Sequence, residues 1–278
     1  MVREIKSDNG HDGRDGTPST QLRMLITRER VAYVGLLGRP KLREFGSLVV
    51  YVALDAPFQI QIDGGEWLGA GMFVVAPDTP HRIASSDRLI GVFMIEPETV
   101  AIDGLPAWLL PSEAASQCLP ALEHVRAAFR ALCANEANVA RACDDMDLFF
   151  LGRTLPARVL DARMAAVVEK INQDPCGLAS AEDCARLVNL SFSRFLHLFK
   201  DEVGTTFRSF RAWKRARSFL CHVNTASSLT DIALDIGYPD SSHFSHTVRR
   251  YWGLTPRDIL AGSRRLAVSS DHPLPVAA

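Results

Sequence analysis

Two short segments of the chain carry the same ordered set of small, imidazole and basic side chains. Ser193, His197 and Lys200 stand at positions i, i+4 and i+7 of the first segment, and His246 and Arg249 repeat the last two positions 49 residues later. In a helix these positions share one face. A short exposed helix face of this composition is typical of contact with base edges and phosphates in a major groove. The spacing therefore indicates nucleic-acid recognition rather than catalysis.

The two segments belong to an internal duplication. Ala185 aligns with Ala233 at an offset of 48, and after a one-residue insertion Gly204 aligns with Gly253 at an offset of 49. Each copy predicts a helix, a short turn and a second helix, in which the small alanine permits close crossing and the glycine ends the second helix. The duplication predicts two helix-turn-helix units.

The second helix of each unit supplies the candidate contact residues. We expect base-edge contacts from its polar face, which carries Ser193, Leu196, His197, Ser241, Ser242, Ser245 and His246. We expect phosphate contacts from the basic residues Arg194, Lys200, Arg215, Arg249 and Arg250. The alternative is that these residues form an ordinary solvated helix surface. On the opposite face of the first copy, Phe192, Phe195 and Phe199 are expected to be buried.

A further helix is predicted between the two units, from Thr205 to His222, with Trp213 among the aromatic residues on one side. Sixteen helical residues span about 24 Å. This length suits two recognition helices held about 34 Å apart, in successive major grooves.

The charge distribution agrees with this assignment. The whole chain has a formal net charge of −1, but residues 161–265 contain 15 Lys and Arg against 11 Asp and Glu. A basic surface confined to one region is expected of a phosphate-binding domain, although a run of charge is more often only a solvated helix face.

The first half of the chain predicts β-structure. Runs of β-branched and alternating apolar residues occur at 48–54, 58–62, 71–77 and 88–95, separated by turn residues. Strands at this spacing imply an antiparallel sandwich or jelly-roll barrel. After Pro111 the apolar period becomes helical, with Ser112 as a candidate N-cap, and this helical part can serve as a dimer face or pack on its own barrel.

Few residues in this half can bind a ligand or a metal. His81 is the only histidine between residues 12 and 123, so we expect no metal site and no cupin enzyme. His81 is interpreted as a structural residue or as a polar contact in a ligand pocket, and Lys41 and Arg43 as a cationic pocket lining or as surface residues. The six cysteines lack a Cys-x-x-Cys pair and are expected to be reduced thiols.

Residues 161–262 resemble the DNA-binding domain of the AraC family of bacterial transcription regulators. The resemblance is carried by the residues LSFSRFLHLFK at 190–200 and GYPDSSHFSHTVRRYWGLTP at 237–256. It implies a seven-helix domain with two helix-turn-helix units, a cupin-like sensor domain before it, promoter binding and contact with RNA polymerase. The family commonly has arginine where this sequence has His197 and His246.

The expected fold is α+β with two domains: an N-terminal antiparallel β-barrel with appended helices and a C-terminal all-α domain. The expected divisions are a tail at 1–20, a β sensor domain at 21–110, a helical extension at 111–152 that can serve as a dimer interface, a linker at 153–160, the DNA-binding domain at 161–264 and a tail at 265–278.

We expect a cytoplasmic protein, because the chain lacks an apolar signal core and any membrane-length apolar run. We further expect a homodimeric transcription activator that is not an enzyme and needs no cofactor. A small-molecule effector in the β domain would modulate promoter binding. The alternatives are an empty barrel controlled by a protein partner and, less favoured, a cupin enzyme fused to a DNA reader.

Overall fold

The structure is a computed structural model. It describes residues 23–36, 41–87, 89–111, 118–134, 139–177, 180–223, 225, 227–263 and 267–270. The predicted N-cap Ser112, the tail at 1–20 and most of the tail at 265–278 lie outside these ranges.

Two β-sheets form the N-terminal domain. The six-stranded sheet has the order β6-β3-β8-β2-β1-β9, and the three-stranded sheet has the order β5-β4-β7. All pairs are antiparallel except β1 with β9. The strands are β1 (Arg23–Ile26), β2 (Arg30–Leu36), β3 (Leu48–Ala53), β4 (Phe58–Ile62), β5 (Trp67–Ala70), β6 (Met72–Val75), β7 (His81–Ala84), β8 (Leu89–Ile95) and β9 (Ala267–Ser270).

The prediction of antiparallel β-structure is confirmed, but the strands do not close into one barrel. The chain passes from one sheet to the other four times: after β3, at Gly71 between β5 and β6, after β6 and after β7. Within the described residues no hydrogen-bonded ladder joins the two sheets. Alternation of this kind makes a sandwich with a shared interior.

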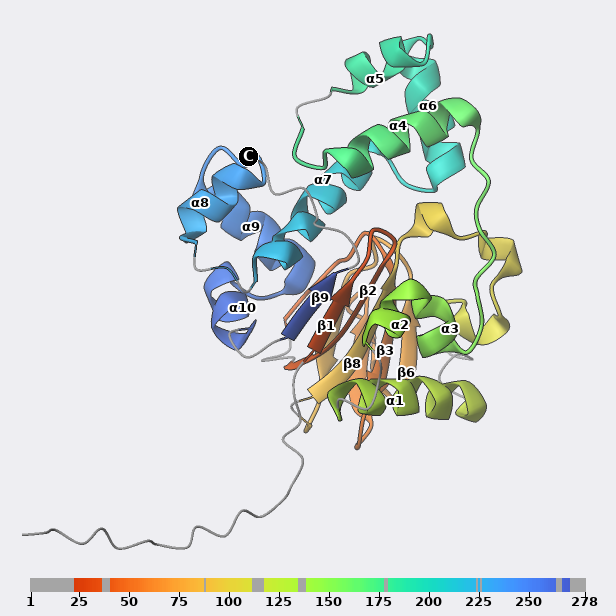
Figure 1. The fold of residues 1–278 in the computed structure, drawn as a ribbon, viewed down its shortest axis with the longest axis vertical. Helices are drawn as coiled ribbons and strands as arrows, with labels where there is room; N and C mark the ends of the chain where they lie inside the picture. The colour runs from red at the N-terminus through yellow and green to blue at the C-terminus, as the bar shows by residue number, and fades with distance from the viewer. Residues whose placement is uncertain are drawn as a thin grey trace, which may run out of the picture.

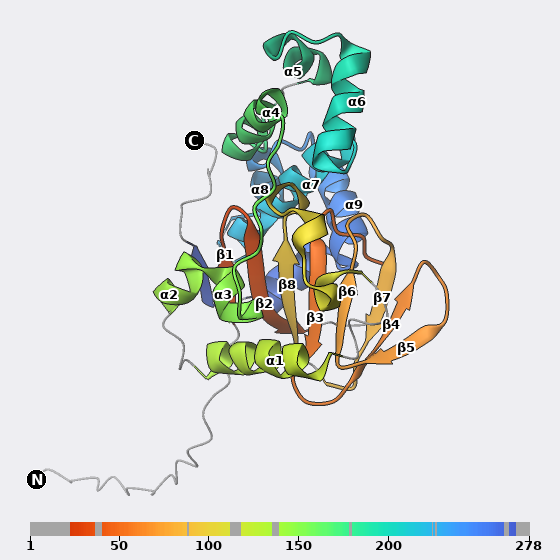
Figure 2. The same ribbon diagram turned by 90° about the vertical axis from the view of Figure 1, so that its right-hand side faces the viewer.

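One face of the six-stranded sheet is covered by helices (Figure 2). After three single 3-10 turns, the chain forms α1 (Leu119–Cys133), α2 (Val139–Asp144) and α3 (Met146–Leu151). The apolar stripe of α1, which includes Val125 and Phe129, packs on this face together with Phe93 of β8 and Phe150 of α3. The stripe therefore covers its own sheet, the second of the two roles that its sequence allowed.

The C-terminal domain is helical; its first helices lie beyond one end of the sheets and its last helices lie beside the six-stranded sheet (Figure 1). Its helices are α4 (Ala162–Gln173), α5 (Ala181–Leu187), α6 (Phe192–Val203), α7 (Phe207–Ser218), the 3-10 helix η5 (Phe219–His222), α8 (Leu229–Asp235), α9 (Ser241–Trp252) and α10 (Pro256–Ser263). These are seven α-helices within the described residues, the number that the AraC resemblance implied.

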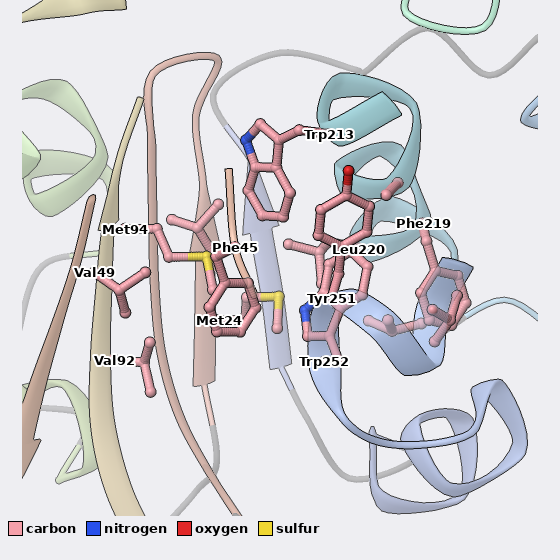
Figure 3. Close-up of a cluster of buried hydrophobic side chains, with 14 of the residues drawn as sticks. Met24, Phe45, Val49, Val92, Met94, Trp213, Phe219, Leu220, Tyr251 and Trp252 are labelled. Carbon is pink, nitrogen blue, oxygen red and sulfur yellow. The ribbon is translucent and has the colours of Figure 1, made fainter. Parts of the chain in front are cut away.

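The other face of the six-stranded sheet is shared by the two domains. It packs on the three-stranded sheet and, beside it, on side chains of α7, η5 and α9, so that one buried cluster runs through both domains. Figure 3 shows Met24, Phe45 and Met94 facing Trp213 and Trp252 within this cluster. The ring centroid of Phe45 lies 5.9 Å from that of Trp213 and 6.2 Å from that of Trp252.

The predicted divisions differ from the structure at two places. Residues 153–160, expected as a linker, are held to the N-terminal domain by an isolated bridge between Val100 and Ala157 and by a bond from the Ala101 amide to the Pro156 carbonyl. Ala267–Ser270 fall in the expected C-terminal tail but pair with β1, because that edge strand otherwise leaves its backbone groups without partners.

Candidate nucleic-acid interface

The first helix-turn-helix unit is defined by local hydrogen bonds. Ser180 and Asp183 form a reciprocal capping box at the start of α5, and the side chain of Ser191 caps α6. Gly204 ends α6 in the left-handed conformation, with φ of 85°. Each device satisfies backbone groups that a helix end leaves unpaired, so the sequence itself fixes where these helices begin and end.

The second unit repeats these devices. Ser228 and Asp231 form the capping box of α8, 48 residues after the first pair, and Asp240 caps α9. Gly253 ends α9 with φ of 67°. The duplication predicted from the sequence is thus present in the hydrogen bonding as well as in the order of helices.

The inserted residue lies at the end of the second turn. The Leu190 amide donates to the Ala185 carbonyl at 3.0 Å, and the Tyr238 amide donates to the Ala233 carbonyl at 2.8 Å, so the first part of both turns is equivalent. The extra residue follows Tyr238, before α9 begins. Both alanines are buried at the crossing of the two helices of their unit, as expected.

The polar faces of α6 and α9 are open to solvent. Ser193, His197, Ser242 and His246 are exposed, while Leu196, Ser241 and Ser245 are partly buried. Phe195 and Phe199 are buried beneath α6 as predicted, but the prediction for Phe192 is wrong, since its side chain is 46% exposed at the first turn of the helix. Figures 1 and 2 show α6 and α9 at opposite ends of α7, which separates them.

The candidate phosphate contacts divide into two groups. Arg194, Lys200 and Arg249 are exposed. The other two have partners within the protein: the guanidinium of Arg215 lies 5.7 Å from the ring centroid of Tyr238, and Arg250 forms a 2.7 Å ion pair with Glu44 of the N-terminal domain. Arg250 would have to exchange this carboxylate for a phosphate.

The helix between the units holds both of them. Phe207 and Phe210 of α7 pack in the core of the first unit, and Trp213 and Ala216 pack in the core shared with the second. The helix is shorter than expected, because the last turn of the predicted span, from Phe219 to His222, is a 3-10 helix. A single helix that is buried at both of its halves fixes the spacing of the two recognition helices.

Two basic residues of α7 were not singled out in the sequence. Lys214 and Arg217 are buried, and the Lys214 ammonium lies 2.5 Å from a carboxylate oxygen of each of Glu96 and Glu98. Arg217 Nε lies 3.0 Å from Glu96 Oε1, and the Trp213 indole donates to the same carboxylate at 3.1 Å. We call Glu96, Glu98, Lys214 and Arg217 the interdomain ion cluster. A period of apolar positions cannot identify such a cluster, because its partners lie more than a hundred residues apart.

The three candidate ligand residues of the N-terminal domain have different environments. Arg43 and His81 are buried between the sheets, with exposures of 3% and 1%, whereas Lys41 is exposed beside Gly253. An apolar cavity of about 300 Å³ opens between β5 and β6, lined by Ile62, Leu68, Phe73, Val74, Val75, Ala76, Thr79 and Pro111.

Within the described ranges, no group of three or more His, Cys, Asp or Glu side chains can hold a metal ion. The same part of the chain contains no helix that is long and apolar enough to cross a membrane.

A family model described as "Helix-turn-helix domain" matches residues 184–262, which run from α5 to α10. The transcriptional activator RhrA of Rhizobium meliloti (strain 1021) is 26% identical over 231 residues, which cover 80% of this chain and 67% of RhrA. Both similarities are to regulators rather than to enzymes.

The fold as a whole is similar to that of ToxT from Vibrio cholerae. The structure from strain O395 matches with a TM-score of 0.55 at 11% identity and covers 84% of this chain and 98% of ToxT. The structure of unsaturated fatty acid bound ToxT from strain SCE256 matches with a TM-score of 0.52 at 12% identity, covering 84% and 95%. The similarity therefore extends over both domains.

Proposed function

Since this chain is a DNA-binding transcription regulator of the AraC type, with its helix-turn-helix domain at residues 184–262, we propose that it reads promoter DNA with α6 and α9 in successive major grooves. The observation that carries the proposal is the repeated pattern of exposed serine, histidine and basic side chains on two helices with matching caps. The residues that contact base edges are Ser193, Leu196, His197, Ser241, Ser242, Ser245 and His246.

Phosphate contacts come from Arg194, Lys200, Arg215, Arg249 and Arg250. These contacts orient the protein on the duplex without carrying sequence information, whereas the imidazoles can hydrogen-bond guanine O6 or N7. A neutral imidazole offers one donor where an arginine offers a bidentate fork, so each histidine contributes less discrimination than an arginine would.

The proposed outcome of promoter binding is activation, through contact with RNA polymerase in the cytoplasm. RhrA is named as a transcriptional activator, which supports this direction. The protein acts as a homodimer in this proposal, so that two copies occupy paired half-sites. The apolar stripe of α1 is buried on its own sheet, so the dimer contact is made by another surface.

A small molecule in the N-terminal domain controls promoter binding in this proposal. The apolar cavity of about 300 Å³ between β5 and β6 supports it, because ligand sites are concave and mostly apolar. ToxT has been solved with an unsaturated fatty acid bound, which is a property of ToxT that agrees with a ligand-responsive regulator of this fold. The empty-barrel alternative, with a protein partner in place of the ligand, lacks a comparable observation.

The test begins with selection of genomic fragments that the purified full chain retains at moderate salt. Affinities of His197→Ala and Arg249→Ala for the selected fragment and its point variants are then measured by fluorescence anisotropy. His197→Ala should lose about 1 kcal/mol on the preferred base, as expected for one hydrogen bond, and relax specificity at one position. Arg249→Ala should weaken binding to all sequences alike and lower the slope of log affinity against log salt by about 1.

His124→Ala and Arg153→Ala are the matched controls, since both side chains are exposed on the N-terminal domain. Each removes the same chemical group as its counterpart and should leave affinity and salt slope unchanged. If neither recognition-helix variant differed from its control, the assigned contacts would be wrong. If no genomic fragment were retained by the parent protein, the proposed function itself would be wrong.

A further inference from the structure

The interior of the N-terminal domain holds a positive charge that has no counter-charge among the residues that the structure describes. The side chain of Arg43 is buried, and its Nε and Nη2 atoms have no hydrogen-bond partner. Among the described residues no carboxylate forms an ion pair with it. A guanidinium stays protonated in proteins, and a buried charge without a partner is strongly unfavourable. The site is therefore short of one anion.

The polar groups around Arg43 are neutral. Arg43 and His81 face each other across an antiparallel bridge, with reciprocal backbone bonds of 3.0 and 2.9 Å. His81 Nδ1 lies 2.8 Å from the Thr79 carbonyl oxygen, which can only accept, so Nδ1 carries the proton and Nε2 accepts from the Tyr51 hydroxyl at 2.8 Å. Burial lowers the pKa of His81 to about 3 and raises the pKa of Tyr51, so neither group is charged near neutral pH.

The direction of these bonds leaves room for one more acceptor. The Tyr51 hydroxyl gives its proton to His81, and its oxygen is a hydrogen-bond partner of the Arg43 guanidinium. Tyr33 is a second phenol close enough to Arg43 to feel its charge, and burial raises its pKa. Donors of Arg43 remain unused after Tyr51 is satisfied, and an anion is the group that would use them.

An apolar cavity adjoins this polar group. Its lining includes Phe73 and Val75, whose side chains belong to the same buried cluster as Tyr51, and it reaches Thr79, the residue that orients His81. The geometry points to an organic carboxylate as the ligand of this domain, with its carboxylate on the Arg43 guanidinium and its apolar body in the cavity. This assignment rests on the proposed control by a small molecule and names the chemical class of that molecule.

The same stretch of chain connects the site to the second recognition helix. We call residues 41–46 the coupling segment. Glu44 pairs with Arg250 near the end of α9, and the Glu44 amide lies 3.4 Å from the Tyr251 carbonyl. At Gly253 the backbone of the coupling segment approaches so closely that a β-carbon would clash with it. An anion that repositions Arg43 therefore moves a segment in direct contact with α9.

Phe45 provides a second connection within the coupling segment. Its ring centroid lies 5.8 Å from that of His81 on one side, and it also contacts Trp213 of α7 and Trp252 of α9 (Figure 3). Packed aromatic rings of this kind transmit a small shift because the core is close-packed. Carboxylate binding thus changes the position of α9 and the availability of Arg250 for DNA.

The binding step is tested by thermal unfolding of the full chain without DNA. Sodium hexanoate and sodium benzoate are compared with hexanamide and benzamide at equal ionic strength. The two carboxylates should raise the Tm by several degrees and the two amides should not, because the amides share the apolar body but lack the charge. Equal shifts with carboxylates and amides, or no shift with either carboxylate, would overturn the assignment.

Arg43→Met distinguishes ligand binding from a structural role of Arg43. Removal of an unpaired buried charge should raise the Tm of the unliganded protein and abolish the carboxylate shift. A lower Tm together with an unchanged carboxylate shift would overturn the assignment. Arg82→Met is the matched control, because Arg82 follows His81 on β7 but bonds to Gln61 outside this group, and it should keep the shift.

The coupling step is tested on the fragment selected for the parent protein. Hexanoate should change the affinity of the parent chain for that fragment and leave the affinity of Arg43→Met unchanged; equal responses would overturn the coupling. The two proposals fail separately. A chain that retains no genomic fragment but shows the Arg43-dependent Tm shift loses the proposed function and keeps the site, and a chain that reads DNA without any carboxylate shift loses the site alone.

Discussion

His81 determines a pH dependence at the scale of a single residue. The pKa of its imidazole is lowered to about 3, first by burial, while the unfolded chain takes up the same proton near pH 6.5. Between these values the unfolded state binds more protons than the folded state, so the free energy of unfolding falls as the pH is lowered through this window. The pKa of His222 is also lowered by burial and adds to the effect in the same direction.

We expect His81→Gln to reduce this acid sensitivity. At pH 5 the protonation of His81 in the unfolded state lowers the free energy of unfolding of the parent by about 2 kcal/mol relative to pH 7.5, since each unit of pH contributes about 1.4 kcal/mol. The variant should lose about 2 kcal/mol less over that interval. Urea unfolding at both pH values measures the difference, and His124→Gln, on an exposed position, should behave as the parent. An identical pH response of parent and His81→Gln would contradict the prediction.

Residue-scale reasoning from sequence was accurate where a side chain's neighbours are local. The exposed imidazoles of His197 and His246 and the buried Phe195 follow from helical spacing alone. Lys41 and Arg43 were assigned the same two roles, pocket or surface, and only the strand pairing with His81 separates them by turning Arg43 inward. Phe192 was wrongly expected in the core: it is the first residue of α6 and is 46% exposed, whereas Phe195 and Phe199 are buried.

At the scale of the element, the two capping boxes give the helix-turn-helix units their local stability. In each, a serine side chain accepts from the backbone amide three residues on, and the aspartate there accepts in return from the serine amide. The two boxes were not identified in the sequence, although the duplication that contains them was. The signal was available, since Ser180 and Ser228 each precede an aspartate by three residues.

Ser228→Ala should lower the free energy of unfolding by about 1 kcal/mol, because the first turn of α8 loses an acceptor for its free amide. Chemical denaturation followed by circular dichroism measures the loss. Ser227→Ala is the matched control, since Ser227 is exposed next to the cap, and it should change stability by less than about 0.5 kcal/mol. Equal effects of the two substitutions would show that the capping box does not stabilise α8.

At the scale of the whole molecule, the two domains share one buried core, and we expect them to unfold cooperatively. A single buried cluster extends from Val49 and Val92 of the six-stranded sheet to Phe244 and Val248 of α9. The interdomain ion cluster adds charges that are paired only when the domains are together. Separation of the domains would expose the apolar surface and leave buried carboxylates without cations.

We therefore expect Lys214→Met to lower the free energy of unfolding by about 3–5 kcal/mol, because it leaves Glu96 and Glu98 buried with one cation fewer. Urea unfolding monitored by tryptophan fluorescence and by circular dichroism should give coincident transitions for the parent. Lys170→Met, on an exposed position of α4, should stay within about 0.5 kcal/mol of the parent. A loss below about 1 kcal/mol for Lys214→Met would contradict the role of the ion cluster.

The sequence by itself determined the duplicated helix-turn-helix units, their exposed faces and the antiparallel strands, because periodicity, capping residues and turn residues act over a few positions. The open arrangement of two sheets, the addition of β9 to β1 and the burial of Lys214 and Arg217 were decided by tertiary contacts. A charged residue on a helix is normally solvated, and only the approach of Glu96 and Glu98 from the other domain makes its burial favourable. The burial of the unpaired Arg43 guanidinium is likewise decided by tertiary structure, since it depends on a strand pairing that no local pattern encodes.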